Sequence, residues 1–580
     1  MGITPPFILL DDARPGGAGA RLYRNPLGIV RAETPGDVKA ALEELRAARG
    51  RGLHAAGYLT YDAGRAFEPR AEARAGKGPC LWFGLFETYE TIDPMDLLPD
   101  PAGAWAGAPR PNITRARYEA QFEHVAELIA AGDIYQANLT FRADVPFAGS
   151  PQALYALLRG RAAAGYGALI ATGEQWLLSL SPELFFALED GKLTARPMTG
   201  TAVRDADPER DRTAAESLAA DPKQRAENLM IVDLMRNDLA RVAQAGSVSV
   251  PQLFHVERYP TVHQMVSTVT ATLSEDLDAL DALAALFPCG SITGAPKLRA
   301  MEIIAEVEDD ARGIYTGSIG RLDADGDAMF NVAIRTLTLG ESATLGLGSG
   351  VVADSEAGEE WAECLAKGAF ITSGENPFDL IETMKFDSEA GMPLLERHLA
   401  RMKASAQLFG FEFDRHAARN ELQAATFRLR NPAKVRLLLA ASGAIAIGIS
   451  ALPDAPHAPV AVAIRPHKVA PDDFRLFHKT SRRSFYPRAP DAFETLYTDA
   501  DGYLTEGSFT SLFVERDGVL ITPPLSRGLL PGVLRAELLE SGRAVEGDLT
   551  PADLENGFFL GNAVRGLVAA VTVADRVFAG

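Results

Sequence analysis

A short acidic segment carries the side chains that most clearly suggest chemistry. It follows a glycine-rich turn in GSGVVADSEAGEEWAECLAK (348–367), where Glu360, Glu363 and Lys367 are spaced three and four residues apart. In a helix, that spacing puts two carboxylates and an ammonium on one face. Neighbouring carboxylates repel unless a proton or cation lies between them, and Mg²⁺ binds through one or two carboxylates plus an anionic substrate. A solvated face of surface ion pairs is the alternative.

Further candidate residues lie upstream of this segment. Glu227 shares the apolar face of a predicted helix, where a carboxylate is costly unless a metal or cation pairs with it. His263 lies in a strand-like run of alternating Val residues, where a structural buried histidine is the alternative. The loop 288–297 places glycines, hydroxyls and a lysine just before a helix, an arrangement that suits an anion. Arg335 lies in a buried-looking strand, where arginine is rarely found without an anionic partner.

The elements that must position these residues are short strands and helices in an irregular order. We predict helices at 114–131, 209–245, 277–286, 298–307 and 394–408, and strand-rich segments at 168–200, 247–272 and 314–352. Runs of strands with helices around them favour α+β units over a regular βαβ repeat. The Pro, Gly and Ala content of 100–112 predicts a loop.

A domain boundary is predicted near SGENP (373–377), where a helical segment ends and a new strand, 379–385, begins. A chain of 580 residues is too long for a single hydrophobic core. We therefore predict two domains, at 1–373 and 377–580.

Composition excludes several classes of protein. A formal net charge of -20 argues against a nucleic-acid partner or an anionic membrane, so an anionic substrate must be met by local cations or a metal. The three cysteines are far apart and form no CxxC pair, which excludes a disulfide framework or a cysteine-rich zinc site. No segment resembles a signal peptide or an apolar membrane span, and we expect a protein of the cytoplasm.

A second group of candidate residues lies beyond residue 377. Lys479 has aromatic and apolar neighbours, which favour a depressed pKa and Schiff-base formation; a surface lysine is the alternative. The segment 529–533 supplies a Gly/Pro turn before a helix, which suits a phosphate. Glu506 can interact with a pyridine nitrogen and strengthen an electron sink.

The first approximately 370 residues strongly resemble the chorismate-utilising enzymes, and most closely their aminodeoxychorismate synthase branch. Besides the acidic segment, the motifs that carry the resemblance are GDIYQANLT (132–140), SPELFF (181–186), AENLMIVDLMRNDLARV (226–242), VHQMVSTV (262–269), GSITGAPKLRAMEII (290–304), IYTGSIG (314–320) and NVAIRTL (331–337). The resemblance implies an α/β sandwich of antiparallel sheets flanked by helices.

This resemblance also implies roles for individual residues. Glu227 and Glu363 bind Mg²⁺, with Glu360 beside them, and the metal holds the ring carboxylate of chorismate. Arg335 binds the side-chain carboxylate of chorismate, and His263 assists departure of the 4-hydroxyl group. By the same resemblance, Tyr315 and the backbone N–H groups of Gly348, Ser349 and Gly350 bind that side-chain carboxylate together with Arg335, and Thr293 and Lys367 complete the pocket.

Thr199 departs from the pattern of the branch that aminates chorismate in the para position. That branch usually carries a nucleophilic lysine at this point of RPMTGTAVR (196–204), and anthranilate-forming relatives carry a small residue. A threonine hydroxyl is a poor nucleophile without an adjacent base. Three readings stay open: Thr199 acts differently, ammonia reaches the ring without a lysine adduct, or the regiochemistry differs.

Residues 377–580 resemble the fold-type IV pyridoxal-phosphate enzymes, which implies a two-subdomain α/β domain. By this resemblance Lys479 bonds the pyridoxal 5'-phosphate, and Glu506 faces its pyridine nitrogen. GNAVRG (561–566) matches the late active-site turn of the family. The residues implied to hold the phosphate are Arg401 and the backbone at Gly532 and Val533, while Ser511 and Leu534 stand where Asn and Thr are often seen.

Together the two halves suggest consecutive reactions. The first converts chorismate and ammonia into 4-amino-4-deoxychorismate, and the second eliminates pyruvate to give 4-aminobenzoate for folate biosynthesis. No Gly-x-Cys-x-Gly turn of a glutaminase is visible, so we expect ammonia from a separate glutamine amidotransferase subunit. We also expect a homodimer through the C-terminal domain.

Two other functions remain alternatives. One is an anthranilate synthase-like ortho-amination of chorismate with a C-terminal transaminase or lyase of other specificity. The other is a non-catalytic scaffold that binds chorismate and recruits the glutaminase, which the intact carboxylate set and Lys479 disfavour.

Overall fold

The computed structural model describes residues 3–68, 70–71, 74–260, 262–340, 342–457 and 459–573. The chain divides into two compact units. Unit 1 spans 1–98, 108–146 and 155–374, and unit 2 spans 99–107, 147–154 and 375–580. The outer ends of the predicted domains, residues 1–2 and 574–580, lie outside the described residues.

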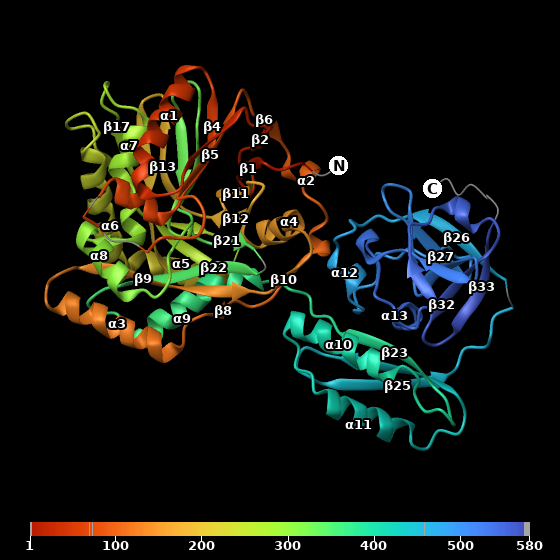
Figure 1. Ribbon diagram of the computed structural model, residues 1–580. Coiled ribbons are helices and arrows are strands. Elements are labelled where there is room, and N and C mark those ends of the chain that lie inside the picture. Colours follow the sequence, from red (N-terminus) through yellow and green to blue (C-terminus); the bar gives the residue numbers. More distant parts are fainter. Residues whose placement is uncertain are drawn as a thin grey trace. The chain divides into compact units, whose positions relative to one another are not determined.

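Unit 1 is built on two large sheets, which have ten strands each in the described part of the chain (Figure 1). The first sheet has the order β18 (Gly294–Ala295), β9 (Gln136–Val145), β22 (Ala343–Val351), β21 (Thr336–Leu339), β12 (Trp176–Ser181), β11 (Tyr166–Ala171), β1 (Phe7–Asp11), β2 (Ala20–Arg24) and β6 (Glu90–Ile92), with β8 (Arg110–Pro111) beside β9. The second has the order β15 (Met198–Val203), β17 (Val262–Thr272), β14 (Lys192–Arg196), β13 (Leu184–Glu189), β20 (Ala328–Asn331), β19 (Ser318–Leu322), β4 (His54–Leu59), β5 (Leu81–Phe86) and β3 (Gly28–Ala32), with β16 (Ser249–Arg258) beside β17.

The two sheets share a core of aromatic and aliphatic side chains. Ile8 and Tyr23 of the first sheet pack in one cluster with Tyr58 and Phe86 of the second. Burying such large apolar side chains supplies most of the stabilisation that a sandwich of this kind requires. The predicted sandwich of antiparallel sheets flanked by helices is therefore confirmed.

Helices cover the sheets and carry part of the candidate site. In Figure 1, α3 (Arg115–Ala130) and α9 (Ala357–Gly368) lie side by side, and both pack on β22. The Thr114 hydroxyl caps α3 by accepting a hydrogen bond from the backbone N–H of Arg117, as its position in the sequence predicts. The other α-helices of six or more residues that lie wholly in unit 1, among the described residues, are α1 (Val38–Gly50), α5 (Pro208–Ala220), α6 (Pro222–Ala240), α7 (Ala279–Leu286) and α8 (Lys297–Val307). A further helix, α4 (Pro151–Ala162), has its last eight residues in unit 1.

The helix predicted at 209–245 is two helices. Its first part ends at Ala220, and α6 begins at Pro222. Proline has no backbone N–H and suits the first position of a helix better than its interior. The Asp221 carboxylate caps the new helix by accepting from the backbone N–H of Gln224. This break sets the direction of α6 and therefore of Glu227.

The described residues from 375 onwards in unit 2 form two sheets, in agreement with the predicted two-subdomain α/β domain. A three-stranded antiparallel sheet of β23 (Leu380–Phe386), β24 (Ala433–Leu439) and β25 (Ile445–Ala451) is accompanied by α10 (Leu395–Phe409) and α11 (Arg415–Thr426). The mixed sheet has the order β28 (Leu504–Gly507), β27 (Glu494–Thr498), β26 (Val460–Pro466), β33 (Gly566–Thr572), β32 (Phe558–Asn562), β29 (Ser511–Arg516), β30 (Val519–Thr522) and β31 (Ala544–Glu546). Helix α13 (Val533–Glu540) connects β30 to β31 in the chain. With unit 1, this confirms the predicted α+β class.

Two short segments from the first part of the sequence belong to unit 2. The predicted loop 100–112 contains strand β7 (Trp105–Ala106), which pairs with β10 (Phe147–Ala148). The Trp105 ring packs edge-on against Phe409 with 4.8 Å between centroids, and its Nε1 donates to Glu375 at 2.6 Å. Within the described residues, no helix is long and apolar enough to cross a bilayer.

Candidate active sites

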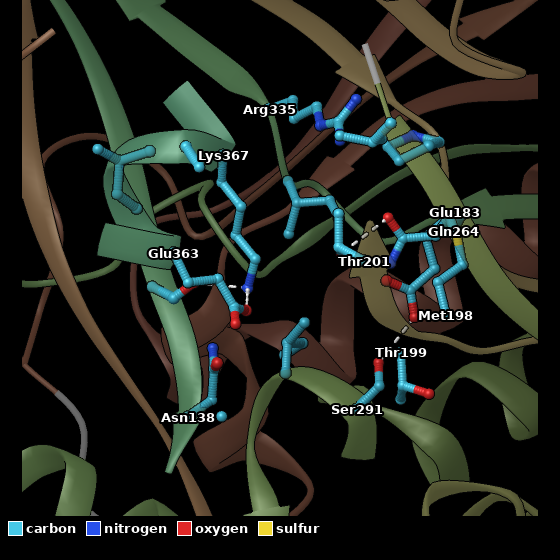
Figure 2. A pocket seen from close by; sticks show the side chains of 18 of the residues that line it. Asn138, Glu183, Met198, Thr199, Thr201, Gln264, Ser291, Arg335, Glu363 and Lys367 are labelled. Carbon is cyan, nitrogen blue, oxygen red and sulfur yellow. Dashed lines mark hydrogen bonds and ion pairs between the residues drawn. The ribbon is translucent and has the colours of Figure 1, made fainter. Parts of the chain in front are cut away.

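A cavity in unit 1 collects eight of the residues expected in the chorismate pocket (Figure 2). The eight that line it are Thr199, Glu227, Tyr315, Arg335, Gly348, Gly350, Glu363 and Lys367. Figure 2 labels four of them, Thr199, Arg335, Glu363 and Lys367. They come from strands of both sheets, from α6 and α9, and from the segments beside β19 and β21. The two sheets and their covering helices therefore meet around one cavity.

An ion pair between Lys367 and Glu363 lines this cavity. Lys367 Nζ lies 2.7 Å from Glu363 Oε1 and donates to the carbonyl oxygen of Gly348 at 2.9 Å. Burial opposes the charge of Lys367, but the neighbouring Glu363 carboxylate outweighs it and raises the pKa of the lysine. Burial also raises the pKa of Glu227 to about 7, with a further contribution from Glu363.

Two carboxylates of this cavity fit a magnesium ion. Glu227 is partly buried and has no ion-pair or hydrogen-bond partner within the described chain, so its carboxylate oxygens are free to bind a cation. Glu363 lines the same cavity and supplies a second hard oxygen donor, the ligand type that Mg²⁺ prefers. Glu360 differs: it does not line the cavity, and its Oε1 accepts from Ser355 Oγ at 2.7 Å. In keeping with this, the described residues contain no metal-binding cluster of three or more His, Cys, Asp or Glu.

Arg335 provides a positive charge that no carboxylate of the described chain neutralises. It lines the cavity, and burial lowers its pKa because a charged guanidinium loses hydration there. Its backbone has φ of +49°, a strained conformation for a side chain other than glycine. Tyr315 also lines the cavity, and its ring lies where a Cβ on Gly346 would stand, 2.0 Å from Cγ. Glycine at 346 therefore lets the phenol ring pack against the strand.

His263 does not reach the cavity, contrary to the sequence-based expectation. It is fully buried, and its Nε2 lies 2.8 Å from Asp211 Oδ1. Its neighbours on β17, Val262 and Gln264, line the cavity instead. Alternate residues of a strand face opposite sides, so this part of β17 presents an amide to the cavity. Figure 2 shows Gln264 beside Thr201, whose Oγ1 donates to Gln264 Oε1 at 3.2 Å.

The side chains of Thr293 and Ser349 also point away from the cavity, although Ser349 is expected to act through its backbone N–H. Thr293 is fully buried, and its Oγ1 donates to the carbonyl oxygen of Cys289 at 2.8 Å. The residues of this loop that line the cavity are Ser291 and Ile292. The hydroxyl of Ser349 lies 3.4 Å from that of Tyr118, on the opposite side of β22 from the cavity lined by Gly348 and Gly350.

Glu183 is a cavity residue that the sequence-based assignment missed. It lies between β12 and β13, and Ser291 Oγ donates to its Oε1 at 2.8 Å. Burial raises the pKa of Glu183 to about 7, so the carboxyl group can hold or release a proton near neutral pH. Its place in the SPELFF motif was a sequence signal that could have pointed to this residue. A residue between two strands belongs to no periodic pattern, however, so the sequence does not predict where its side chain points.

The Thr199 hydroxyl lines the cavity without a base beside it. Its oxygen accepts a hydrogen bond from Asn228 Nδ2 at 2.8 Å, and Asn228 Oδ1 accepts from Ser267 Oγ at 2.5 Å. An amide that donates to the hydroxyl cannot remove its proton. This geometry does not activate Thr199 as a nucleophile.

A second cavity, in unit 2, surrounds Lys479. Burial lowers the pKa of Lys479 to about 7, so a large fraction of its amine is uncharged near neutral pH. The Nζ donates to Thr383 Oγ1 at 3.3 Å. The expected residues Arg401, Glu506, Gly532, Val533 and Leu534 line the same cavity. Lys479 is thus a buried amine and not a surface lysine.

The surroundings of Lys479 fit pyridoxal phosphate. Arg401 donates to both oxygens of Glu382 and to the carbonyl oxygen of Pro531, which leaves two of its five N–H groups for a phosphate. Gly532 precedes α13, and a Cβ there would stand 2.6 Å from Ser511 Oγ. Burial raises the pKa of Glu506 to about 7, and Tyr486 OH donates to its Oε1 at 2.6 Å. These groups can hold a phosphate and a pyridine nitrogen.

Comparison with known proteins gives two family matches, one for each of the two parts of the chain that hold a cavity. Residues 6–373 match the family profile described as chorismate binding enzyme, and residues 379–573 match that described as amino-transferase class IV. Among solved structures, the crystal structure of anthranilate synthase component I from Streptococcus pneumoniae TIGR4 is similar. Its TM-score is 0.53 at 26% identity, with coverage of 64% of this chain and 93% of that chain.

Two curated relatives are named aminodeoxychorismate synthase component 1. That of Klebsiella aerogenes is 47% identical over 259 residues, which are 44% of this chain and 57% of the relative. That of Salmonella typhimurium strain LT2 is 40% identical over 338 residues, which are 54% of this chain and 74% of the relative. The chain thus matches the first relative over less than two thirds of its length.

The buried Glu183 predicts a pH-dependent difference in stability. Its pKa is about 7 in the folded chain against an ordinary value of 4.5, so folding favours the protonated form. Wild type should lose stability as pH rises from 4.5 through 7, while Glu183→Gln has no charge to bury. The variant should gain up to about 3 kcal/mol over wild type at pH 8 and nothing at pH 4. Thermal unfolding at both pH values measures this, and an equal difference at both would contradict the buried charge.

Proposed function

Because this chain belongs to the chorismate binding enzyme family, we propose that unit 1 converts chorismate and ammonia into 4-amino-4-deoxychorismate. Unit 2 would then release pyruvate from that product and leave 4-aminobenzoate. The observation that carries this proposal is the presence, in one chain, of two cavities with complementary chemistry. One is lined by Arg335, which has no carboxylate partner in the described chain, and by the carboxylates of Glu227 and Glu363, and the other holds a lysine with a pKa of about 7.

In the first cavity, the side chains suit a ring with two carboxylates. Arg335, which lacks a carboxylate partner in the described chain, would bind one of them, with Tyr315 beside it. Glu227 and Glu363 would hold the magnesium ion, which when bound neutralises the charge of the other carboxylate. Release of Glu363 from Lys367 would accompany this change and leave the ammonium free to face the substrate.

Departure of the 4-hydroxyl group requires a proton, and Glu183 is suited to supply it. His263 faces Asp211 outside the cavity, and Gln264 has no acidic proton near neutral pH. Glu183 lines the cavity with a pKa of about 7, near the value at which a carboxyl group serves both as acid and as base. The protonated carboxyl would transfer its proton to the leaving oxygen as the C4–O bond breaks.

In the second cavity, Lys479 would act on the aminated ring. Pyridoxal phosphate, when bound, supplies an electron sink for the amine-bearing carbon. Lys479 Nζ would take the C4 proton, and the C3–O bond would break with its electron pair passing to the enolpyruvyl oxygen, so that the ring becomes aromatic. The released enolpyruvate takes up a proton and becomes pyruvate. Glu506 would face the pyridine nitrogen and share a proton with it, since burial raises the pKa of its carboxyl group to about 7. Arg401 would hold the phosphate.

Ammonia is proposed to come from a separate glutamine amidotransferase. The chain has no Gly-x-Cys-x-Gly turn, and all three cysteines are buried. The curated relatives are named as component 1 of their synthase, which is in keeping with a second component. Efficient hydrolysis of glutamine by the isolated chain would contradict this part of the proposal.

An ortho-aminating function is the second candidate, because Thr199 stands where the para-aminating branch usually carries lysine. The similarity to anthranilate synthase component I also favours it. An ortho product would lose its enolpyruvyl group within the first cavity and give no substrate for Lys479. Unit 2 would then be a transaminase or a lyase of other specificity, and amino-group exchange with 2-oxoglutarate without pyruvate release would identify a transaminase.

The identity of the aminobenzoate isomer tests the main proposal. Purified chain with chorismate, Mg²⁺, ammonium and pyridoxal phosphate should form 4-aminobenzoate and an equal amount of pyruvate, separated and quantified by chromatography. Lys479→Ala should accumulate 4-amino-4-deoxychorismate and release pyruvate more than about 1000-fold more slowly, because no amine takes the C4 proton. Formation of 2-aminobenzoate, or unchanged pyruvate release by the variant, would contradict the assignment.

Thr199→Ala separates a covalent role from a structural one. Because Asn228 donates to the hydroxyl and no base contacts it, we expect the rate of chorismate consumption to change by less than about threefold. Steady-state kinetics with ammonium as the nitrogen source measure this. A loss of more than about 100-fold in kcat, with the fold intact by circular dichroism, would instead make Thr199 the nucleophile.

Glu363→Ala should weaken the first step through loss of a magnesium ligand. We expect at least about a 100-fold loss of chorismate turnover and loss of its dependence on Mg²⁺ concentration. Glu359→Ala, an exposed glutamate in the first turn of the same helix, is the matched control and should keep the wild-type dependence on Mg²⁺. Full Mg²⁺ dependence in Glu363→Ala would remove this residue from the metal site.

A further inference from the structure

The second cavity contains far more positive charge than a cofactor phosphate requires. Seven lysine and arginine side chains and one carboxylate, that of Glu506, line it in the described part of the chain. The basic residues are Arg401, Lys434, Arg436, Lys479, Arg483, Arg488 and Arg565. This excess occurs in a chain whose formal net charge is -20, so it is not a consequence of overall composition.

Two of the seven have roles that the cofactor explains. Arg401 is paired with Glu382 and has two N–H groups left for a phosphate, and Lys479 is the amine beside it. The other five have no carboxylate within ion-pair distance in the described part of the chain. Elsewhere in the same unit, arginines are commonly paired: Arg397, for example, contacts both Glu537 and Glu540. Cations gathered without counterions repel each other, and an anionic ligand offsets that cost.

Arg436 is placed next to the reacting amine by the register of two strands. It pairs with Thr383 across β24 and β23, and Thr383 Oγ1 accepts from Lys479 Nζ at 3.3 Å. Side chains opposite each other on neighbouring strands share one face of the sheet. Lys434, two residues before Arg436, lies on that face as well and also lines the cavity. Both positive charges therefore adjoin the position where a bound amine would react.

Arg483 approaches the cavity from the segment after Lys479. Its Nη2 donates to the carbonyl oxygen of Ser508 at 2.7 Å, and its guanidinium lies over the ring of Tyr486, 4.8 Å from the centroid. These two contacts fix the plane of the group. Its Nη1 is buried and has no hydrogen-bond partner, although a buried donor of this kind normally has one. Arg483 thus lines the cavity with a guanidinium whose plane is fixed and one of whose donors has no partner.

We propose that Arg436 and Arg483 bind the two carboxylates of the substrate in unit 2, so that this cavity selects a dianionic amine over an amino acid with one carboxylate. The inference rests on the proposed function for the identity of that amine, 4-amino-4-deoxychorismate. An ordinary amino acid brings one negative charge and leaves most of the five cations uncompensated. A ring with two carboxylates satisfies two arginines at once, each through charge-assisted hydrogen bonds.

Kinetics with the aminated ring supplied directly test this assignment without the first reaction. In the holoenzyme, Arg436→Gln and Arg483→Gln should each raise the KM for 4-amino-4-deoxychorismate by about tenfold to 100-fold and change kcat by less than about threefold. Arg436→Lys should recover part of the affinity. Arg428→Gln, which removes an exposed arginine of the same unit outside the cavity, is the matched control and should keep the wild-type KM.

A second readout does not depend on turnover. Benzene-1,3-dicarboxylate and benzoate are titrated into the holoenzyme while the absorption of the bound cofactor is followed, because that signal reports on unit 2 alone. Wild type should respond to the dicarboxylate at a concentration at least about tenfold lower than to benzoate. The ratio should fall towards one in Arg436→Gln and Arg483→Gln and stay unchanged in Arg428→Gln.

The two readouts separate failure of this inference from failure of the proposed function. Wild type that releases no pyruvate from the aminated ring but prefers the dicarboxylate through Arg436 and Arg483 would overturn the proposed reaction and support dianion recognition. Wild type that releases pyruvate while both variants keep its KM and its dicarboxylate preference would overturn the inference alone. Equal responses to the two probes in wild type would also overturn it.

Discussion

Both cavities depend on one constraint, which is that the fold buries ionisable side chains without placing a group of opposite charge beside them. Burial shifts the pKa of Arg335, Glu227 and Lys479 in the direction that favours the neutral form. None of the three has an ion-pair partner within the described chain. Leaving such groups dry is unfavourable, so the cores of the two units must stabilise the fold against that cost. An ionic ligand that enters recovers part of this free energy, which is why these positions favour binding.

Proton transfer in the first cavity is confined to few groups. Burial raises the pKa of Tyr315 to about 12, and Glu363 holds Lys367 in its charged form. Among the groups discussed there, Glu183 and Glu227 are the ones whose pKa lies near 7. Glu227 is suited to a metal, and a bound cation would keep it ionised. The remaining carboxyl, Glu183, is then the group that can exchange a proton with the substrate at neutral pH.

Much of the fold was predictable because its signals are local. The helix at 114–131 was found as α3, since a capping threonine and a glycine mark its ends, and the acidic segment forms α9. The sequence could not predict which side chains of β17 face the cavity. Both faces of that strand are largely buried, so its pattern of apolar and polar residues does not distinguish one face from the other. His263 and Gln264 are adjacent in sequence, yet only the three-dimensional packing decides which of them meets the cavity. The same holds for Trp105, whose loop-like surroundings conceal a strand of unit 2.

The charge of the whole chain could not predict the charge of its cavities. A sum of -20 suggests that an anionic ring would be repelled, but at physiological ionic strength exposed charges are screened over about 8 Å. Contacts inside a cavity act over shorter distances and with less screening than those across the surface. Recognition of an anion in a cavity therefore depends on the few cations that line it, and Arg335 lines the cavity of unit 1 and Arg436 that of unit 2. An acidic chain can in this way bind a dianion twice, provided that each cavity keeps its own cations free of internal carboxylates.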